Sequence, residues 1–372
     1  MSTIKNLYKK WQSLQPLNET LQRRMDQQFM FDFNYNSNHI EGNTLTYGQT
    51  KLLLLFGRTE GDGLMRDYEE MKAHNVGLEL MKREAKDKRP LTENFIRELN
   101  RIILVGDHYK VEGKKRNKVH TGIYKTRQNS VVTLSGEMFD FASPEETPAM
   151  MADLVAWYRE AEKEGKLTIA ELVAMFHYRY IRIHPFEDGN GRIVRLLVNY
   201  ILHRHGYPMI VVSTTDRTNY LETLNKCDKI TGFATSDGAN ATKEQVKPLT
   251  DYLANLIEDK LRLVISFAKG EIDSFAESDV AETMLDNQND RSKPQSSVVE
   301  NVVEVSSENI IAKRQKMIVN FMRMNSKISA KEIADLLKTN PRTIQRDIQQ
   351  LKSAGIIERV GGDRGGYWKT TK

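Results

Sequence analysis

Hydrophobic residues recur every three or four positions through most of the first 270 residues, a spacing typical of amphipathic helices. The predicted helices cover residues 1–30, 45–105 (with connecting turns), 148–160, 168–183, 192–204 and 246–267. The helix at 192–204 is apolar nearly all round after Arg195, so we expect it to be the central buried helix.

A different pattern occupies residues 122–136. Two short runs rich in β-branched and aromatic residues, 122–126 and 131–136, flank a polar turn, which predicts a β-hairpin. Residues 273–310 are rich in Ser, Asp, Glu, Asn and Gln and are predicted to be a linker. The chain therefore divides into an N-terminal helical region (1–110), a core (111–272), the linker (273–310) and a tail (311–372).

The tail shows three helical segments followed by two short strands. Ser329 and Glu332 form a capping box at the start of the second helix. In the third helix, Ile344, Ile348 and Leu351 recur on one face, which is expected to point inward. The order of elements resembles a winged helix-turn-helix domain.

Composition narrows the class of protein. A length of 372 residues suggests two or three domains. The single cysteine, Cys227, cannot form an intramolecular disulfide and fits a reducing compartment. No run approaches the roughly 20 apolar residues that span a bilayer, and the N-terminus lacks the apolar stretch of a signal peptide. We expect a cytoplasmic protein without a membrane partner.

Charge is unevenly distributed. The net charge is +5, but residues 311–372 contain 14 Lys and Arg against 5 Asp and Glu, so the tail carries +9 and the remainder −4. A basic tail of this kind is typical of nucleic-acid-binding domains.

The most informative stretch runs from His184 to Arg195. His184 precedes a proline, which moves its backbone into a turn. Asp188 is followed by Gly-Asn-Gly, whose N–H groups an anion can approach, and then by a helix with unpaired donors at its positive end. Arg192 and Arg195 can reach one anion from the same helix face. The pattern predicts a polyphosphate and divalent-metal site beside a proton acceptor. The alternative is a glycine-rich turn between two core helices.

The string His-Pro-Phe-Glu-Asp-Gly-Asn-Gly-Arg-Ile-Val-Arg resembles the Fic family signature, His-x-Phe-x-(Asp/Glu)-Gly-Asn-Gly-Arg-x-x-Arg, at every fixed position. Fic proteins are mostly AMP transferases, which move AMP from ATP to a Ser, Thr or Tyr hydroxyl and release pyrophosphate. The resemblance implies that His184 is the general base, that Phe186 anchors the loop in the core and that Asp188 binds Mg²⁺. Glu187 fills a variable position and is given no catalytic role. The implied phosphate-binding residues are Gly189, Asn190, Gly191, Arg192 (β phosphate) and Arg195 (γ phosphate).

A second motif lies near the N-terminus. Ser37 and Glu41 are four residues apart, on one face if the segment is helical, and Gly42 and Asn43 are a natural helix stop. The string resembles the Fic inhibitory motif, (Ser/Thr)-x-x-x-Glu-(Gly/Asn), whose glutamate pairs with the second arginine of the site. That arginine is Arg195 here, and a carboxylate on it competes with phosphate. The alternative is a short capped helix with a solvated glutamate.

The resemblance adds two further sets of nucleotide contacts. Fic proteins carry a hairpin, the flap, which pairs main chain to main chain with the target. The flap residues expected near nucleotide and target are Thr133, Leu134, Ser135 and Gly136. Tyr220 matches an aromatic residue that closes the adenine pocket and would stack on the base, with a packed core tyrosine as the alternative. Asp228 stands where the family often has asparagine, which weakens the expected nucleotide contact at that position.

The tail would place its third helix in a DNA major groove. The candidate DNA contacts are Arg342, Thr343, Arg346 and Gln349. Many winged helices bind protein instead.

Together these features predict a mainly α protein, with a Fic fold (a helical bundle with a β-hairpin flap) and a small C-terminal winged helix. The expected activity is protein adenylylation with ATP and Mg²⁺, inhibited through Glu41 and directed at target proteins and at the chain itself. The expected partners are target proteins bound along the flap, DNA and a second copy of the chain. Alternatives are a DNA-binding regulator with a nucleotide-sensing Fic core, or a Fic protein that uses another nucleotide or removes AMP.

Overall fold

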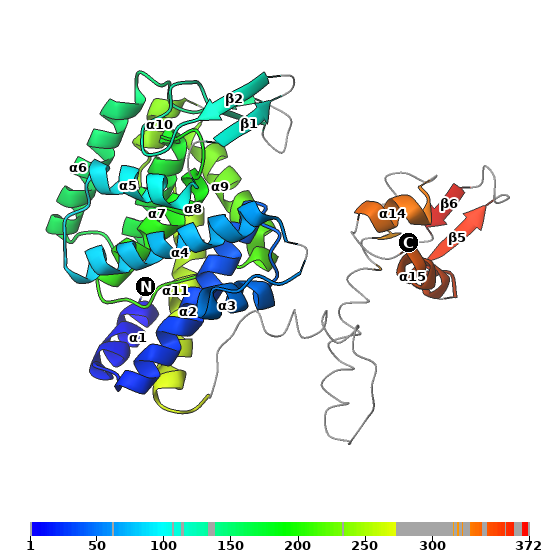
Figure 1. Ribbon diagram of the computed structural model, residues 1–372, viewed down its shortest axis with the longest axis horizontal. Coiled ribbons are helices and arrows are strands. Elements are labelled where there is room, and N and C mark those ends of the chain that lie inside the picture. The colour runs from blue at the N-terminus through cyan, green and yellow to red at the C-terminus, as the bar shows by residue number, and fades with distance from the viewer. Residues whose placement is uncertain are drawn as a thin grey trace. The chain divides into compact units, whose positions relative to one another are not determined.

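Helices dominate the computed structural model, as the hydrophobic pattern predicts (Figure 1). The chain separates into two compact units, Met1–Gln288 and Asn289–Lys372. The structure describes residues 2–61, 63–105, 108–112, 115–132, 138–232, 234–272, 315, 318–319, 322, 328–336, 341–353, 355–360 and 367–370. None of the helices in these ranges is long and apolar enough to cross a membrane.

Among its described residues, the first unit contains the helices α1 to α11, a 3₁₀ turn and two hairpins. Its helices are α1 (Ser2–Ser13), α2 (Glu19–Ile40), α3 (Tyr47–Phe56), α4 (Met65–Lys86), α5 (Glu93–Ile103), α6 (Thr147–Glu164), α7 (Ile169–Ile183), α8 (Asn190–Arg204), η1 (Thr214–Asp216), α9 (Arg217–Thr231), α10 (Thr235–Ala239) and α11 (Lys247–Ala268). Its strands are β1 (His108–Glu112), β2 (Lys115–Val119), β3 (Ser130–Val132) and β4 (Met138–Asp140).

The prediction of one helix over residues 1–30 is wrong. α1 ends at Ser13 and α2 begins at Glu19, with Pro16 between them. Proline has no amide proton and disfavours a helical residue before it, so the helix stops. Asn18 then caps α2 by accepting a hydrogen bond from Leu21 N at 2.9 Å.

A large hydrophobic core takes residues from every α-helix between α1 and α11 except α3, whose Leu53 belongs to a smaller cluster with Tyr68 and Met71 of α4. α8 contacts α2, α4, α5 and α7, and Figure 1 shows it behind α4 and α5. Its residues from Ile193 to Leu202 are all buried, as expected for the central helix. The termini of α7 and α8 that meet here position the site described below.

The predicted pairing of residues 122–126 with 131–136 is also wrong. β3 pairs antiparallel with β4, with Val131 opposite Phe139, and residues 122–126 form no strand. Their backbone is engaged elsewhere, because the Lys125 amide donates to the Pro185 carbonyl at 2.8 Å. A second hairpin, β1 with β2, escaped prediction because its residues are mostly polar and lack clear alternation. The four predicted flap residues, 133–136, lie outside the described residues.

The second unit has its own small core, which includes Ile318, Ile344 and Ile357. Its described elements are α14 (Ala330–Leu336), α15 (Pro341–Ser353), β5 (Ile357–Val360) and β6 (Tyr367–Thr370). β5 and β6 are antiparallel and α14 packs on α15. The predicted capping box is present, since Ser329 N donates to Glu332 Oε2 at 2.7 Å and Glu332 N to Ser329 Oγ at 3.1 Å.

Candidate active site

The end of α7 sets the backbone of His184. The helix ends at Ile183, and His184 caps it with φ 52° and ψ 62°, donating its amide to Tyr180 O at 2.9 Å. A residue other than glycine in this left-handed region is uncommon and costs about 1–3 kcal/mol. Contacts from other segments must therefore hold the histidine in place.

Lys125 supplies two of these contacts. Its amide donates to Pro185 O at 2.8 Å and its Nζ to Ile183 O at 3.0 Å, so it binds the carbonyls on both sides of His184. The Lys125 side chain is buried, and this burial lowers the pKa of its ammonium group to about 8. Sequence analysis did not identify this lysine, because its partners are backbone atoms far along the chain.

The imidazole of His184 stacks on the ring of Phe141. The ring centroids are 4.0 Å apart and the planes meet at 14°. Phe141 directly follows β4, and its amide donates to Asn129 O at 3.1 Å. The stacking fixes the plane of the imidazole. The sequence did not indicate this role, because Phe141 belongs to no motif and lies far from His184 along the chain.

The loop from Pro185 to Gly189 is anchored in the core by Phe186. Phe186 is fully buried, and its ring lies 5.7 Å from that of Tyr124. Asn190 closes the loop, because its Nδ2 donates to Phe186 O at 2.7 Å and its Oδ1 accepts from Phe186 N at 3.0 Å. The Asn190 side chain is thus used within the loop, which leaves only its backbone to an anion.

Glu187 ties the same loop to residues 118–127. Its carboxylate accepts a hydrogen bond from Thr126 Oγ1 at 2.9 Å and pairs with Arg127 Nη2 at 3.1 Å. Its side chain is only 6% exposed, and these contacts engage its carboxylate. This structural role is consistent with the absence of a catalytic role in our interpretation of the sequence.

The N-terminus of α8 faces the loop. Gly189 caps the helix with φ 81°, a conformation that favours glycine, and its amide donates to Asp188 Oδ1 at 2.9 Å. α8 begins at Asn190, two residues before the predicted start. The first-turn amides of a helix have no acceptor within the helix, so this end is suited to an anion.

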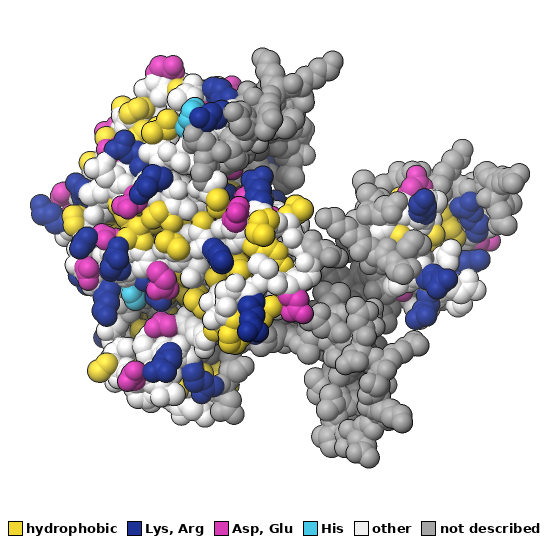
Figure 2. Space-filling model, viewed as in Figure 1, with side chains coloured by type: hydrophobic (Ala, Val, Ile, Leu, Met, Phe, Trp, Pro, Cys, Tyr) yellow, Lys and Arg dark blue, Asp and Glu magenta, His cyan; other side chains and the backbone are white. Residues whose placement is uncertain are grey.

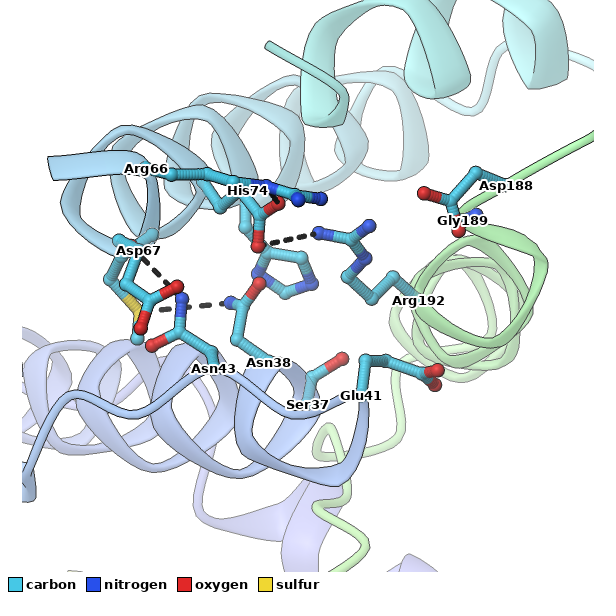
Figure 3. A network of polar contacts seen from close by, with 12 residues as sticks. Ser37, Asn38, Glu41, Asn43, Arg66, Asp67, His74, Asp188, Gly189 and Arg192 are labelled. Carbon is cyan, nitrogen blue, oxygen red and sulfur yellow. Dashed lines mark hydrogen bonds and ion pairs between the residues drawn. The ribbon is translucent and has the colours of Figure 1, made fainter. Parts of the chain in front are cut away.

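The carboxylate of Glu41 lies over this helix end (Figure 3). A Cβ atom added at Gly191 would overlap Glu41 Oε1. Glu41 is the residue that caps the C-terminus of α2, as the Gly42-Asn43 stop predicts. A carboxylate from the N-terminal helices therefore occupies the approach to the Gly-Asn-Gly backbone.

Arg195 is bound by the two residues of the N-terminal motif. Its Nη2 donates to Glu41 Oε1 at 2.7 Å and to Ser37 O at 2.8 Å, and its Nε to Ser37 Oγ at 3.1 Å. The Arg195 side chain is 5% exposed and that of Glu41 is 39% exposed. The structure thus brings Arg195 to the pair Ser37 and Glu41, which lies more than 150 residues earlier in the sequence.

Arg192 faces a different carboxylate. Its Nη1 lies 3.6 Å from Oε2 of Glu70 on α4, and Glu70 Oε1 accepts from Arg66 Nε at 2.8 Å. Sequence analysis missed Glu70. Its spacing of four from Arg66 is typical of an ordinary surface ion pair on a helix, so it gave no sign of contact with the site.

Tyr220 is packed in the core, which is the alternative that the sequence left open. It is 3% exposed, and its hydroxyl lies 2.6 Å from His177 Nε2. Burial raises the pKa of Tyr220 to about 12 and lowers the pKa of His177 to about 3, so both groups are neutral near pH 7. The Tyr220 ring packs against those of His177 and Tyr252, at centroid distances of 5.7 and 5.9 Å. Asp228 accepts a hydrogen bond from Tyr178 Oη at 2.8 Å.

Asp188 is the carboxylate for which the resemblance implies Mg²⁺. It is partly buried beside the α8 N-terminus. Mg²⁺ commonly takes one or two carboxylates together with phosphate oxygens and water, so a single acid at this place fits the ion. Within the described ranges, no group of three or more His, Cys, Asp or Glu side chains could hold a metal.

In the second unit, α15 carries the four candidate DNA contacts. Arg342, Arg346 and Gln349 are exposed, and Thr343 is partly exposed. Ile344, Ile348 and Leu351 are buried, as their spacing predicts. One face of α15 is therefore polar and accessible.

Two family models match the chain. Residues 90–202 match the Fic/DOC family, and residues 305–372 match the winged helix-turn-helix transcription repressor, HrcA DNA-binding. The first match contains the whole string from His184 to Arg195 and the second contains α14, α15 and both strands of the wing.

Two curated relatives are protein adenylyltransferases named fic-1. That of Caenorhabditis briggsae is 29% identical over 227 residues, covering 60% of this chain and 41% of the relative. That of Caenorhabditis elegans is 28% identical over 263 residues, covering 70% and 46%. The chain thus spans somewhat less than half the length of these relatives.

A solved structure gives a stronger comparison. A Fic-domain-containing signaling protein from Bacteroides thetaiotaomicron is 57% identical, with a TM-score of 0.69, and the match covers 73% of this chain and 99% of that protein. Identity at this level along nearly the entire length of a Fic protein, with the same fold, means that this chain belongs to the Fic family.

Proposed function

We propose that the chain is a protein adenylyltransferase, which transfers AMP from ATP to a Ser, Thr or Tyr hydroxyl of a target protein. The observation that carries the proposal is the meeting of His184, the Gly189–Gly191 backbone and Arg192 at the N-terminus of one buried helix, α8. The names of the nematode relatives support the same reaction class.

In this reaction, His184 accepts the proton of the target hydroxyl as its oxygen bonds to the α phosphorus. The bond from that phosphorus to the bridging oxygen breaks, and pyrophosphate leaves. The helix end and Arg192 neutralise the phosphate charge, which is the main requirement of phosphoryl-type transfer. Mg²⁺ held by Asp188 would add charge neutralisation when bound. The stacking on Phe141 and the two Lys125 hydrogen bonds orient His184.

We further propose that Glu41 inhibits the reaction. Its carboxylate takes the place of a phosphate on Arg195 and over the α8 N-terminus. A γ phosphate needs the same guanidinium, so the two anions compete. Ser37 supports the inhibited arrangement by accepting two further hydrogen bonds from Arg195.

The test is transfer of label from α-³²P-ATP with Mg²⁺, using Glu41→Gly protein in a cell lysate. We expect label on target bands and on the protein itself, and none with the Glu41→Gly, His184→Ala protein. Label from UTP or CTP but not ATP would change the nucleotide in the proposal. Absence of label from every nucleotide, with folded protein, would refute nucleotidyl transfer.

We propose DNA binding as a second function, because α15 exposes Arg342 and Arg346 beside Gln349. The test is a mobility shift with a pool of random duplexes at two salt concentrations. We expect a complex that weakens as salt rises and weakens further with Arg346→Ala. A complex unaffected by both changes would refute binding through this helix.

We also propose that the first unit pairs with a second copy. Phe56, Leu64 and Met65 are each about two thirds exposed, at 67%, 65% and 66%, and Figure 2 shows hydrophobic surface near α3 and the start of α4. Contiguous exposed apolar surface is typical of interaction sites, whereas singly scattered apolar residues are not. Sedimentation should show a dimer that Met65→Asp dissociates, and a monomer at high concentration would contradict this.

A further inference from the structure

Arg192 carries a buried donor without an acceptor. Its side chain is 5% exposed, and its Nε has no hydrogen-bond partner in the part of the chain that the structure describes. Nearly all buried polar groups in proteins are satisfied, so an orphaned donor at a candidate site is expected to meet a ligand. Figure 3 shows the guanidinium between α4 and the α8 N-terminus, close to Asp188.

Glu70 meets this guanidinium at one end only. Its Oε2 lies 3.6 Å from Arg192 Nη1, while its Oε1 accepts from Arg66 Nε at 2.8 Å. Because Arg66 engages the second oxygen, Glu70 does not form the two-point contact that a carboxylate can make with a guanidinium. The contact with Glu70 therefore involves Nη1 of Arg192 and not its Nε or Nη2.

His74 lies one turn further along α4 and is neutral. It is fully buried, and burial, then Arg192 and Arg195, hold the pKa of its imidazole well below the ordinary value. Its Nδ1 is 2.7 Å from Asn34 Oδ1, and the Asn34 amide donates to Met30 O, so the imidazole donates to the Asn34 oxygen. A neutral His74 does not compete with the arginines for the charge of Glu70.

We propose that Glu70, held by Arg66, is a positioning residue that orients Arg192 toward the β phosphate of the nucleotide. This inference rests on the proposed nucleotidyl transfer. Glu70 differs from Glu41 in kind, because Glu41 lies where the phosphate would lie, whereas Glu70 contacts the Arg192 guanidinium from α4. Removing Glu41 should strengthen nucleotide binding, and removing Glu70 should weaken it.

The test compares nucleotides that differ only in the β phosphate. Binding of ADP and AMP is measured by calorimetry for Glu41→Gly protein with and without Glu70→Gln. We expect Glu70→Gln to weaken ADP binding by about 10- to 100-fold, by analogy with the range found for groups that orient metal ligands, and to leave AMP binding unchanged. Glu69→Gln is the matched control, since Glu69 is exposed on the same helix and loses the same charge.

A double-mutant cycle separates positioning from a general structural effect. In an Arg192→Ala background, Glu70→Gln should cause no further loss of ADP affinity. If Glu70→Gln lowers the melting temperature, Glu70→Asp is used instead, because it keeps the charge and shortens the side chain. It should also weaken ADP binding without weakening AMP binding. The inference would be overturned if Glu70→Gln weakened ADP and AMP binding equally, or if it tightened ADP binding. It would also be overturned if Glu70→Gln caused its full loss of ADP affinity in the Arg192→Ala background. If Glu41→Gly protein with Glu70 intact binds neither ATP nor ADP, the proposed function itself fails.

Discussion

Replacing Glu41 by glycine removes the carboxylate that occupies Arg195 with little change to the fold. The position caps α2 with φ −91° and ψ 4°, outside the helix proper, so glycine does not interrupt helical hydrogen bonds. Ser37 keeps its two contacts with Arg195. The substitution therefore changes chiefly the anion at the guanidinium and at the α8 N-terminus.

The expected gain follows from the strength of one contact. A hydrogen bond between charged groups contributes about 1.5–3 kcal/mol. The Glu41 side chain is 39% exposed, so solvent screening reduces this to about 1–2 kcal/mol. Since 1.4 kcal/mol corresponds to a factor of ten, the rate at limiting ATP should rise about 5- to 30-fold.

The assay is the initial rate of label incorporation from α-³²P-ATP, with ATP below saturation. Glu41→Gln keeps the size of the side chain without its charge, so we expect a rate between those of wild type and Glu41→Gly. The Glu41→Gly, His184→Ala protein gives the background. Equal rates and equal ATP affinities for wild type and Glu41→Gly would refute the competition between Glu41 and phosphate.

Two further substitutions test how the loop around His184 is held. Phe186→Ala should lower the free energy of unfolding by about 3–5 kcal/mol, because Phe186 is fully buried, and a loss below 1 kcal/mol in denaturant titrations would contradict its anchoring role. Lys125 has a folded pKa of about 8, below the ordinary 10.5, so the unfolded chain binds more protons between these values and stability should rise with pH across them. The unfolding free energy of wild type minus that of Lys125→Met should therefore increase from pH 8 to 10.5. If this value stayed constant or fell, burial would not penalise the ammonium.

Local signals in the sequence predicted much of the helical fold. The capping box at Ser329 and Glu332 joins residues only three apart, and it occurs as predicted. The hairpin was mispredicted because β propensity does not reveal that the Lys125 amide is bound to Pro185. Only the folded chain could show that residues 130–132 pair with residues 138–140 instead.

The candidate site divides in the same way. A contiguous string predicted the loop after α7 and the helix that follows it, although α8 begins two residues before the predicted start. Phe141 contacts His184 and Glu70 contacts Arg192, each from another element of the fold. No periodicity in the sequence connects these pairs. For Tyr220, the resemblance located a position in the chain but not the direction of its side chain, which packing against His177 decides.

Glu41 lies at the very end of α2. Whether its carboxylate binds Arg195 should therefore depend on how often the last turn of this helix opens. Glu41, Gly42 and Asn43 are held by amide hydrogen bonds to Asn38 and His39, at 3.0, 3.0 and 3.2 Å. Fraying of this last turn needs far less free energy than unfolding the whole domain. Warming or mild denaturant should thus release the carboxylate while the body of the helix stays protected from hydrogen exchange. The temperature at which the proposed transfer activity appears would then be set by one helical turn.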